Sequence, residues 1–373
     1  MSPEEKSKTP RLLVMGVGGS GARAVARLGR LYSEVDAVAV DTDSRVLAEI
    51  DSVRTIHVGT RTTGGFSAGG DVELGRQAIE RDSSAIRRQL QQVDLLLLVA
   101  GLGRGTASGA APVITRIARE AGAHILCLLT LPFAFEGDTA KKTAETALKR
   151  IRSHADAIVR IANDRLIDPD EAEDIPVEKA FERGMGVILS GVQALWRILA
   201  RSGVCGLDFA DIQTMLRHCD GFCHFAGAEA AGENRAEAVA RGILEHRLLD
   251  GGRVLDGAAG VIIGLTGGHD LRLSEVETVM NRLRERLPAD VRLSFGVTVD
   301  PAFDHRLSAI VLVAESWKEP LVDDAVPARG PRQGELPLEI GGRGRFAGTD
   351  PTIYRNEDLD VPTYIRRGVK LPR

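Results

Sequence analysis

The chain has 373 residues, of which 43% are hydrophobic and 27% charged, as is typical of a soluble globular protein with one large or two ordinary domains. Its net charge of −4 gives no overall basic field that would favour nucleic acid as a partner. The N-terminal stretch MSPEEKSKTPR lacks the apolar core of a signal peptide, and no run reaches the 18 apolar residues of a membrane span. We therefore predict a cytoplasmic protein without direct membrane insertion.

The four cysteines do not indicate a disulfide framework or a metal centre. Cys127 lies in an apolar run, as expected for a buried thiol. Cys219 and Cys223 are four residues apart, with His218 and His224 beside them, but no second ligand pair follows at zinc spacing. We predict a reduced protein with no metal site.

Apolar runs of strand length alternate with helical patterns through the first 160 residues. This alternation predicts a parallel sheet that is covered by helices on both faces. The predicted strands are 11–17, 36–40, 54–58, 95–99, 124–131 and 157–161. The predicted helices are 22–31 and 73–92, and a small-residue loop with four glycines covers 62–70.

The most informative stretch is VDLLLLVAGLGRGTASGAAP at 93–112, which has the pattern of a strand, a glycine-rich loop and a helix start. Its loop holds Gly101, Gly103, Gly105, Thr106, Ser108 and Gly109. Glycines let backbone N–H groups approach an anion, the helix dipole adds positive charge, and the two hydroxyl groups are further donors. The stretch predicts a phosphate site, although a small βα turn without a ligand is the alternative.

A second glycine motif competes for the interpretation of the first strand. Gly16, Gly18 and Gly21 form a G-x-G-x-x-G pattern between a strand and a helix, and Asp41 ends the next strand. That arrangement is typical of dinucleotide binding and, taken alone, predicts a dehydrogenase. The second phosphate loop and the lack of a His or Lys constellation for hydride transfer oppose this interpretation.

The second half of the chain has a different organisation. Apolar spacing over 177–199 predicts a long buried helix that connects two domains. Strands at 260–265, 292–299 and 308–314 with a helix at 273–287 then predict an α+β domain. Residues 318–355 are rich in proline and glycine, as in flexible linkers, and the apolar and basic residues after 356 suggest a docking peptide or a random tail.

Taken together, these segments resemble the FtsZ family of bacterial tubulin homologues. The matching segments are GVGGSGARAV at 16–25, DTD at 41–43, AGLGRGTASGAAPVI at 100–114, LPFAFEG at 131–137, NDRL at 163–166, GLDFADIQTML at 206–216, GENRA at 232–236 and LTGGHDL at 265–271. The resemblance implies an α/β fold with a tubulin/FtsZ-type parallel-sheet nucleotide-binding domain, a long central helix, a second α+β domain, and a disordered linker and tail peptide. The implied boundaries are 1–10 for a disordered N-terminus, then 11–176, 177–201, 202–316, 317–356 and 357–373 for these parts in order.

The resemblance also implies a site for GTP or GDP, with Mg²⁺ held through the nucleotide. Glu136 would contact the ribose, and Asn163 would lie by the nucleoside. The implied nucleotide-binding residues are Gly18, Gly19, Ser20, Gly21, Ala22, Arg23, Asp43, Ala68, Gly69, Gly70, Gly101, Gly103, Arg104, Gly105, Thr106, Ala107, Ser108, Gly109, Glu136, Ala140, Asn163, Phe181 and Met185.

Two acidic residues carry the implied hydrolysis. Asp208 and Asp211 match an acidic loop that, in the family, reaches the nucleotide of a neighbouring subunit, so a head-to-tail filament would be needed for turnover. A carboxylate can position the attacking water for such a reaction. From the residues alone, the favoured interpretation is instead that Asp208 is the N-cap of the helix that follows it.

Several family positions are changed in this chain. Arg104 and Ala107 replace glycines of the phosphate loop, Arg23 replaces an asparagine, and Ala140 replaces an arginine. Met185 stands where an aspartate would read the guanine edge, and Met185 cannot accept those hydrogen bonds. The alternative function is therefore a divergent FtsZ-like filament protein with weak, absent or non-guanine nucleotide hydrolysis.

The tail implies partners beyond the chain itself. The segment DLDVPTYIRR at 358–367 resembles the FtsZ C-terminal peptide, which binds membrane-tethering and regulatory division proteins. Its partner-binding residues would be Leu359, Val361, Pro362, Tyr364, Ile365, Arg366 and Arg367. The implied protein is a cytoplasmic GTPase at the division ring beneath the inner membrane.

Overall fold

The structure, a computed structural model, describes residues 10–167, 174–200, 206–219, 221–317, 350, 352–355 and 357–359. The chain divides into two compact units, Met1–Pro320 and Leu321–Arg373. Within the described part of the second unit, β11 (Ile353–Tyr354) pairs antiparallel with β12 (Glu357–Asp358). Of the predicted tail residues, Leu359 is described and exposed, and the others lie outside the described residues.

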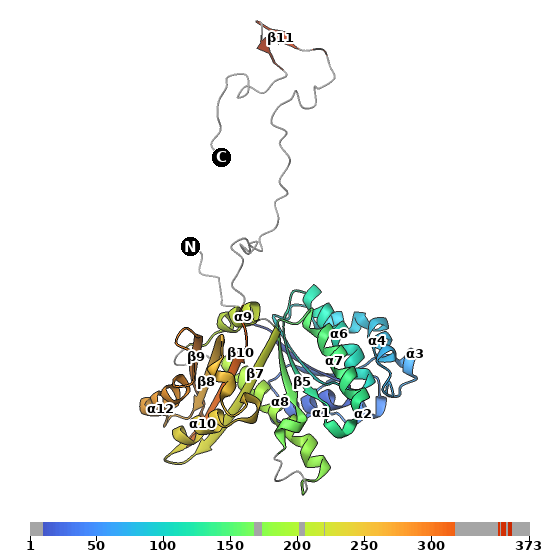
Figure 1. Ribbon diagram of the computed structural model, residues 1–373. Coiled ribbons are helices and arrows are strands. Elements are labelled where there is room, and N and C mark those ends of the chain that lie inside the picture. Colours follow the sequence, from blue (N-terminus) through green and yellow to red (C-terminus); the bar gives the residue numbers. More distant parts are fainter. Residues whose placement is uncertain are drawn as a thin grey trace. The chain divides into compact units, whose positions relative to one another are not determined.

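Ten strands of the first unit form one sheet in the order β3-β2-β1-β4-β5-β6-β7-β10-β8-β9 (Figure 1). Their bounds are β1 Leu12–Val17, β2 Ala37–Asp41, β3 Arg54–His57, β4 Leu95–Gly101, β5 His124–Leu131, β6 Ala157–Ala162, β7 Gly221–Ala231, β8 Gly260–Gly267, β9 Arg292–Val299 and β10 Arg306–Ala314. The strands β1 to β6 pair in parallel, whereas β10 runs antiparallel to both β7 and β8. The two halves join where β6 pairs with the start of β7.

The helices cover both faces of this sheet. Their bounds are α1 Gly18–Leu31, α2 Ser44–Ala48, α3 Thr60–Thr63, α4 Val72–Arg81, α5 Ser83–Gln89, α6 Gly105–Glu120, α7 Asp138–Arg152, α8 Val177–Ala200, α9 Phe209–His218, α10 Arg235–Leu244, α11 Arg253–Asp256 and α12 Leu273–Arg284. Short 3₁₀ turns lie at Ala134–Glu136, Asn163–Leu166, Arg247–Leu249 and Pro301–Phe303. The predicted α/β fold is confirmed, including the long helix.

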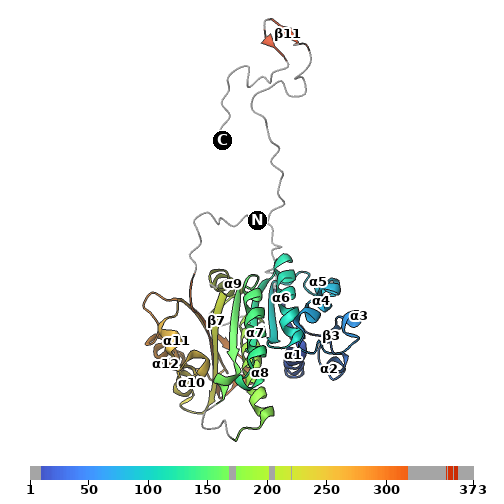
Figure 2. The ribbon, with the colours of Figure 1, turned by 45° about the vertical axis from the view of Figure 1, so that its right-hand side comes forward.

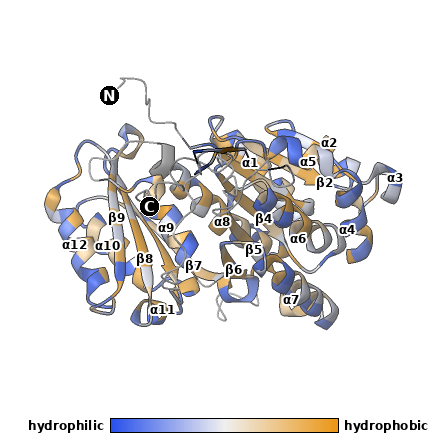
Figure 3. Cartoon of the chain, turned by 90° about the horizontal axis from the view of Figure 1, so that it is seen from above, coloured by the Kyte–Doolittle hydropathy of each residue, from blue (hydrophilic) through white to orange (hydrophobic). Residues whose placement is uncertain are grey.

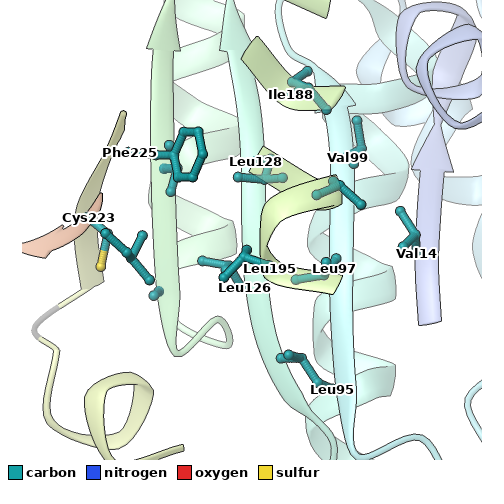
Figure 4. Packing of buried hydrophobic residues seen from close by; sticks show 14 of the residues in the cluster. Val14, Leu95, Leu97, Val99, Leu126, Leu128, Ile188, Leu195, Cys223 and Phe225 are labelled. Carbon is teal, nitrogen blue, oxygen red and sulfur yellow. The ribbon is translucent and has the colours of Figure 1, made fainter. Parts of the chain in front are cut away.

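Strand β4 shows why the sheet is buried on both faces. Successive side chains of a strand point to opposite faces, so an unbroken apolar run fills two cores. Leu95, Leu97 and Val99 join the cluster that also contains residues of α1, α8 and α9. Figure 4 shows these three side chains with other residues of the cluster. Leu96 and Leu98 join the cluster under α4, α5, α6 and α7. Figure 3 shows the same division, with hydrophobic strands inside and hydrophilic residues on the outer helix faces.

Helix α8 connects the parallel half of the sheet, β1 to β6, to the half that contains β7 to β10. It has 24 residues, which corresponds to about 36 Å of helix. Ile188, Val192 and Leu195 are buried in the cluster that also contains Phe225 of β7. Gly191 brings the backbone close to the Phe225 ring, because a Cβ at that glycine would lie 3.4 Å from the ring. Helix α8 also packs against α1.

Two glycines of the predicted phosphate loop, Gly105 and Gly109, lie inside α6, where they pack against α4. A Cβ at Gly105 would lie 2.6 Å from the backbone oxygen of Asp71, and one at Gly109 would lie 2.3 Å from that of Val72. On the other helix, a Cβ added at Gly75 of α4 would lie 2.4 Å from the backbone oxygen of Gly105. These glycines therefore allow two helix backbones to touch.

We expect Gly109→Ala to lower the free energy of unfolding by about 1–3 kcal/mol, because the new methyl group must push the two helices apart. A matched control is Gly186→Ala in α8, where, among the described residues, no atom beyond the adjoining helix backbone lies within 4 Å of the added Cβ. That substitution should instead raise stability by about 0.5–1 kcal/mol, since alanine favours a helix over glycine. Urea unfolding of both variants measures the difference, and equal effects would contradict the packing argument.

Candidate functional site

A cavity of about 960 Å³ lies where five neighbouring strands of the sheet end. Its lining contains the residues that end or directly follow β1, β2, β4, β5 and β6: Gly18, Asp41, Gly101, Leu131 and Asn163. Ligands of open parallel sheets bind at the carboxyl ends of the strands, where loops can be shaped without disturbing the ladder. The helices α1, α6 and α8 provide most of the remaining wall.

Two helix N-termini converge on one end of this cavity. Gly18 to Gly21 begin α1, and Thr106 and Ala107 lie in the first turn of α6. Neither helix has a side-chain cap or an acidic residue in its first turn. Their first N–H groups and both positive dipole ends are therefore available to an anion. Gly18 has a φ of +72°, and a Cβ at this position would lie only 2.9 Å from the Ala107 Cβ. The starts of the two helices are therefore in close contact.

The end of β2 adds a buried polar group to the wall. Asp41 is 2% exposed, and its carboxylate accepts the N–H groups of Thr42 and Asp43 at 2.6 and 3.2 Å. Burial raises the pKa of Asp41 above its ordinary value, although these two N–H groups act in the opposite direction. Thr42 Oγ1 lies 2.8 Å from Thr106 Oγ1, which ties this wall to the start of α6. Asp43 caps α2 through the Arg45 N–H.

Away from the helix N-termini, the cavity wall consists of polar and aromatic side chains. Arg104 Nη2 lies 3.9 Å from Glu136 Oε2, and the Arg104 side chain is 83% exposed. Phe181 packs edge-to-face on Phe133 at 5.0 Å but stays 43% exposed. Asn163 is buried, and its Oδ1 has no hydrogen-bond partner among the described residues. An unpartnered buried acceptor in a cavity wall suits a ligand with hydroxyl or amino donors.

The acidic pair Asp208 and Asp211 lies away from this cavity and does not line it. The two residues form a capping box at the start of α9, with Asp211 N to Asp208 Oδ1 at 3.1 Å and Asp208 N to Asp211 Oδ2 at 3.0 Å. Ser294 of β9 donates to Asp211 Oδ1. Phe209, next to Asp208, packs edge-to-face on His124, the first residue of β5, whereas the cavity is lined by Leu131, the last residue of that strand, which is about 23 Å further along.

Comparison of the sequence and the fold with those of known proteins shows the family to which this chain belongs. The profile "Tubulin/FtsZ family, GTPase domain" matches residues 11–169, and "FtsZ family, C-terminal domain" matches residues 221–316. The cell division protein FtsZ of Buchnera aphidicola subsp. Schizaphis graminum is 33% identical over 311 residues, which are 83% of this chain and 80% of that protein. The chain belongs to the FtsZ family.

Other FtsZ proteins give the same result. Cell division protein FtsZ 1 of Archaeoglobus fulgidus is 31% identical over 304 residues and 80% of each chain. A solved structure, the empty FtsZ dimer of M. jannaschii, matches with a TM-score of 0.76 and 29% identity over 84% of this chain and 92% of that one. This FtsZ-family chain therefore carries the GTPase domain of a cell-division cytoskeletal family, as the sequence predicted. The dehydrogenase interpretation of the first glycine motif is not supported.

The FtsZ-type cavity brings together more than half of the residues that the sequence predicted for it. The predicted residues in its wall are Gly18, Gly19, Ser20, Gly21, Arg23, Asp43, Gly101, Arg104, Thr106, Ala107, Glu136, Asn163, Phe181 and Met185. Those outside the wall are Ala22, Ala68, Gly69, Gly70, Gly103, Gly105, Ser108, Gly109 and Ala140. Ser108 is buried and accepts the Gly103 N–H at 3.0 Å, so it shapes the loop from behind.

The sequence prediction missed a group of charged residues in the same wall. They are Arg27 and Arg30 of α1, Glu49 beside α2, and Glu178 and Glu182 of α8. Helical spacing could have revealed the arginines, because Arg23, Arg27 and Arg30 share one face of α1.

In the part of this FtsZ-family chain that the structure describes, none of the helices has the length and apolar character of a membrane span.

Proposed function

We propose that this chain is a cell-division GTPase that binds GTP with Mg²⁺, polymerises head to tail and hydrolyses GTP at the junctions between its subunits. One observation carries the proposal: the cavity lies at the carboxyl end of β5, where Leu131 lines it, whereas Phe209, next to Asp208, packs on His124 at the start of that strand. A site that is split in this way can be completed only when one subunit stacks on the next. A repeated contact between different surfaces produces an open filament when its rotation does not close into a ring.

The nucleotide phosphates would occupy the end of the cavity where α1 and α6 begin. The N–H groups of Gly19, Ser20 and Gly21 on one helix and of Thr106 and Ala107 on the other would bind phosphate oxygens. Asn163 would accept a hydrogen bond from the nucleoside, which would satisfy its buried Oδ1. Mg²⁺, held by the phosphates, would neutralise the charge that develops at the γ-phosphate. Glu136 would contact the ribose.

Asp208 and Asp211 would act on the nucleotide of the neighbouring subunit. Their capping bonds fix both side chains at the start of α9, but a carboxylate can accept more hydrogen bonds than these. A water bound between the pair and the γ-phosphate would be held in line for attack. The capping role and the proposed catalytic role are therefore compatible.

The proposal makes hydrolysis a property of the filament. Phosphate release per subunit should rise steeply with protein concentration, in parallel with light scattering, and both should need GTP and Mg²⁺. Phosphate release that is strictly proportional to protein concentration, without scattering, would contradict hydrolysis at junctions.

A mixing experiment tests the split site directly. Gly19→Asp places a negative charge at the phosphate end, where a Cβ has room and an acidic residue suits the start of α1. This variant and the Asp208→Asn/Asp211→Asn variant should each be nearly inactive. Sedimented filaments that contain both in equal amounts should regain about a quarter of wild-type turnover, because one junction in four is then complete. Co-sedimentation without any recovery would refute the split site.

For the rest of the chain, we propose the boundaries 11–176, 177–201, 202–316, 317–356 and 357–373 and a docking role for the last segment. The sequence DLDVPTYIRR supports this role because an apolar and basic peptide suits a groove on a partner protein. Such a tail would attach filaments to a membrane-bound division protein and place them at the division ring beneath the inner membrane.

A further inference from the structure

The cavity continues beyond the phosphate end into a region with paired charges. On α1, Arg23, Arg27 and Arg30 line it, and on α8 it is lined by Glu178 and Glu182. The two helices pack against each other in this part of the molecule, as Figure 2 shows. If the phosphates occupy the N-termini of α1 and α6, the cavity leaves room for the base of the nucleotide in this charged region.

The charged side chains here are only loosely paired. Arg27 Nη1 lies 3.9 Å from Glu182 Oε1, and the two side chains are 52% and 54% exposed. That distance is longer than a hydrogen bond, so both groups can still bond to a ligand. Arg30 differs, because it donates to Asp51 at 3.1 Å. Arg27 and Glu182 are thus a donor and an acceptor side by side in the wall of the cavity.

The edge of guanine is the complement of this pair. Guanine presents the O6 acceptor beside the N1–H and N2–H donors, whereas adenine presents one amino donor beside an acceptor and has no third polar group. Met185 lies three residues after Glu182 in the same wall and offers only a weak thioether acceptor. A guanidinium for O6 and a carboxylate for N1–H and N2–H would bond to all three positions of guanine.

We propose that Glu182 and Arg27 read the guanine base in this chain, with Glu182 accepting from N1–H and N2–H and Arg27 donating to O6. This inference rests on the proposed GTP site and names the residues that give it specificity. A carboxylate one helical turn before Met185 would then supply the acceptor that Met185 lacks. Hydrogen bonds to charged groups in such a site separate GTP from analogues by factors of about 10–100.

The test compares equilibrium binding of GTP, ITP and ATP to the full chain in the presence of Mg²⁺. Inosine keeps O6 and N1–H but lacks the 2-amino group. The wild type should therefore bind GTP about 10-fold or more tightly than ITP, and bind ATP more weakly still. Glu182→Gln should weaken GTP binding by about 10–100-fold and bring the affinities for GTP and ITP close together.

Arg27→Met gives an independent result. It removes the donor to O6, which GTP and ITP share, so both should weaken by about 10-fold while their ratio is kept. Glu285→Gln is the matched control, because Arg282 and Glu285 form an equally loose pair at 3.9 Å at the end of α12, which does not line the cavity. This control should bind all three nucleotides as the wild type does.

The possible outcomes separate the inference from the proposed function. Tight GTP binding by Glu182→Gln with the wild-type ratio of GTP to ITP would overturn the role of Glu182 and leave the GTP site standing. A wild-type preference for ATP would overturn guanine recognition by this pair. Failure of the wild type to bind any of the three nucleotides would overturn the site itself and the inference with it.

Discussion

Replacing Asp208 and Asp211 together with asparagine will lower GTP turnover in filaments by about 10²–10⁴-fold, the range that a positioned acid or base contributes. Asparagine keeps the side-chain oxygens that cap α9, since it is as good an N-cap as aspartate. The substitution therefore removes the two charges and leaves the helix start in place. The measurement is phosphate release at saturating GTP, together with filament mass by sedimentation.

The same variant should bind GTP with wild-type affinity in dilute solution, because neither aspartate lines the cavity of its own subunit. Asp256→Asn is a suitable control, since it changes a half-exposed carboxylate that pairs with Arg286 on another part of the surface. Turnover within about threefold of wild type, in filaments of normal mass, would show that hydrolysis does not use these carboxylates.

The first half of the fold was predictable because its strands are long apolar runs between clear helical patterns. Strand β7 was missed, since its sequence GFCHFAGAEAA is rich in alanine and glycine, which rarely form strands by propensity alone. Nine paired residues on β10 hold it in the sheet instead. The predicted helix 73–92 is divided at Asp82, whose carboxylate accepts the Gly59 N–H, a contact that no local pattern reveals.

The phosphate end of the site was predictable because several glycines between a strand and a helix are typical of a phosphate-binding loop. Even so, sequence alone could not separate glycines that face the cavity, such as Gly19 and Gly101, from Gly109, which packs against α4. Charged residues such as Glu182 were harder still to recognise, because a charge on an amphipathic helix usually faces solvent. Only the approach of α1 to α8 places this charge in a cavity wall.

Replacing Arg235 with methionine should lower the free energy of unfolding by about 2–3 kcal/mol, because it removes the charge-assisted hydrogen bonds of a buried guanidinium while the carboxylates that remain are partly exposed to water. The Arg235 side chain is 5% exposed, and it joins α10 to α12 through Glu275, with Nε–Oε1 and Nη2–Oε2 distances of 2.6 and 2.9 Å. Its Nη1 also lies 2.9 Å from Asp270 Oδ2. Methionine fills similar space but leaves both carboxylates without their cation.

Chemical denaturation at pH 7 measures this loss, and Arg282→Met provides the comparison. Arg282 pairs with Glu237 on the surface, where both side chains are about half exposed, so its loss should cost at most about 1 kcal/mol. Equal losses for the two variants would show that the buried network contributes no more than a surface pair.

The pH dependence of stability gives a second test of the same network. The hydrogen bonds from Arg235 lower the pKa of Glu275 below its ordinary value of 4.5. Burial alone would raise the pKa of Asp270, but the His305 N–H and Arg235 outweigh it and lower that pKa below 3.8. A carboxylate with a lowered pKa in the folded state stabilises the fold above its ordinary pKa, and this contribution is lost as the pH falls through the folded value.

The wild type should therefore lose stability as the pH falls below about 4.5, and Arg235→Met should lose less over that range, because Glu275 and Asp270 no longer have the guanidinium that lowers their pKa values. Denaturation midpoints between pH 3 and 7 compare the two slopes. The stability difference between the proteins should be largest near pH 7 and should shrink as the carboxylates become protonated. A difference that stays constant down to pH 3 would assign the effect of Arg235 to packing alone.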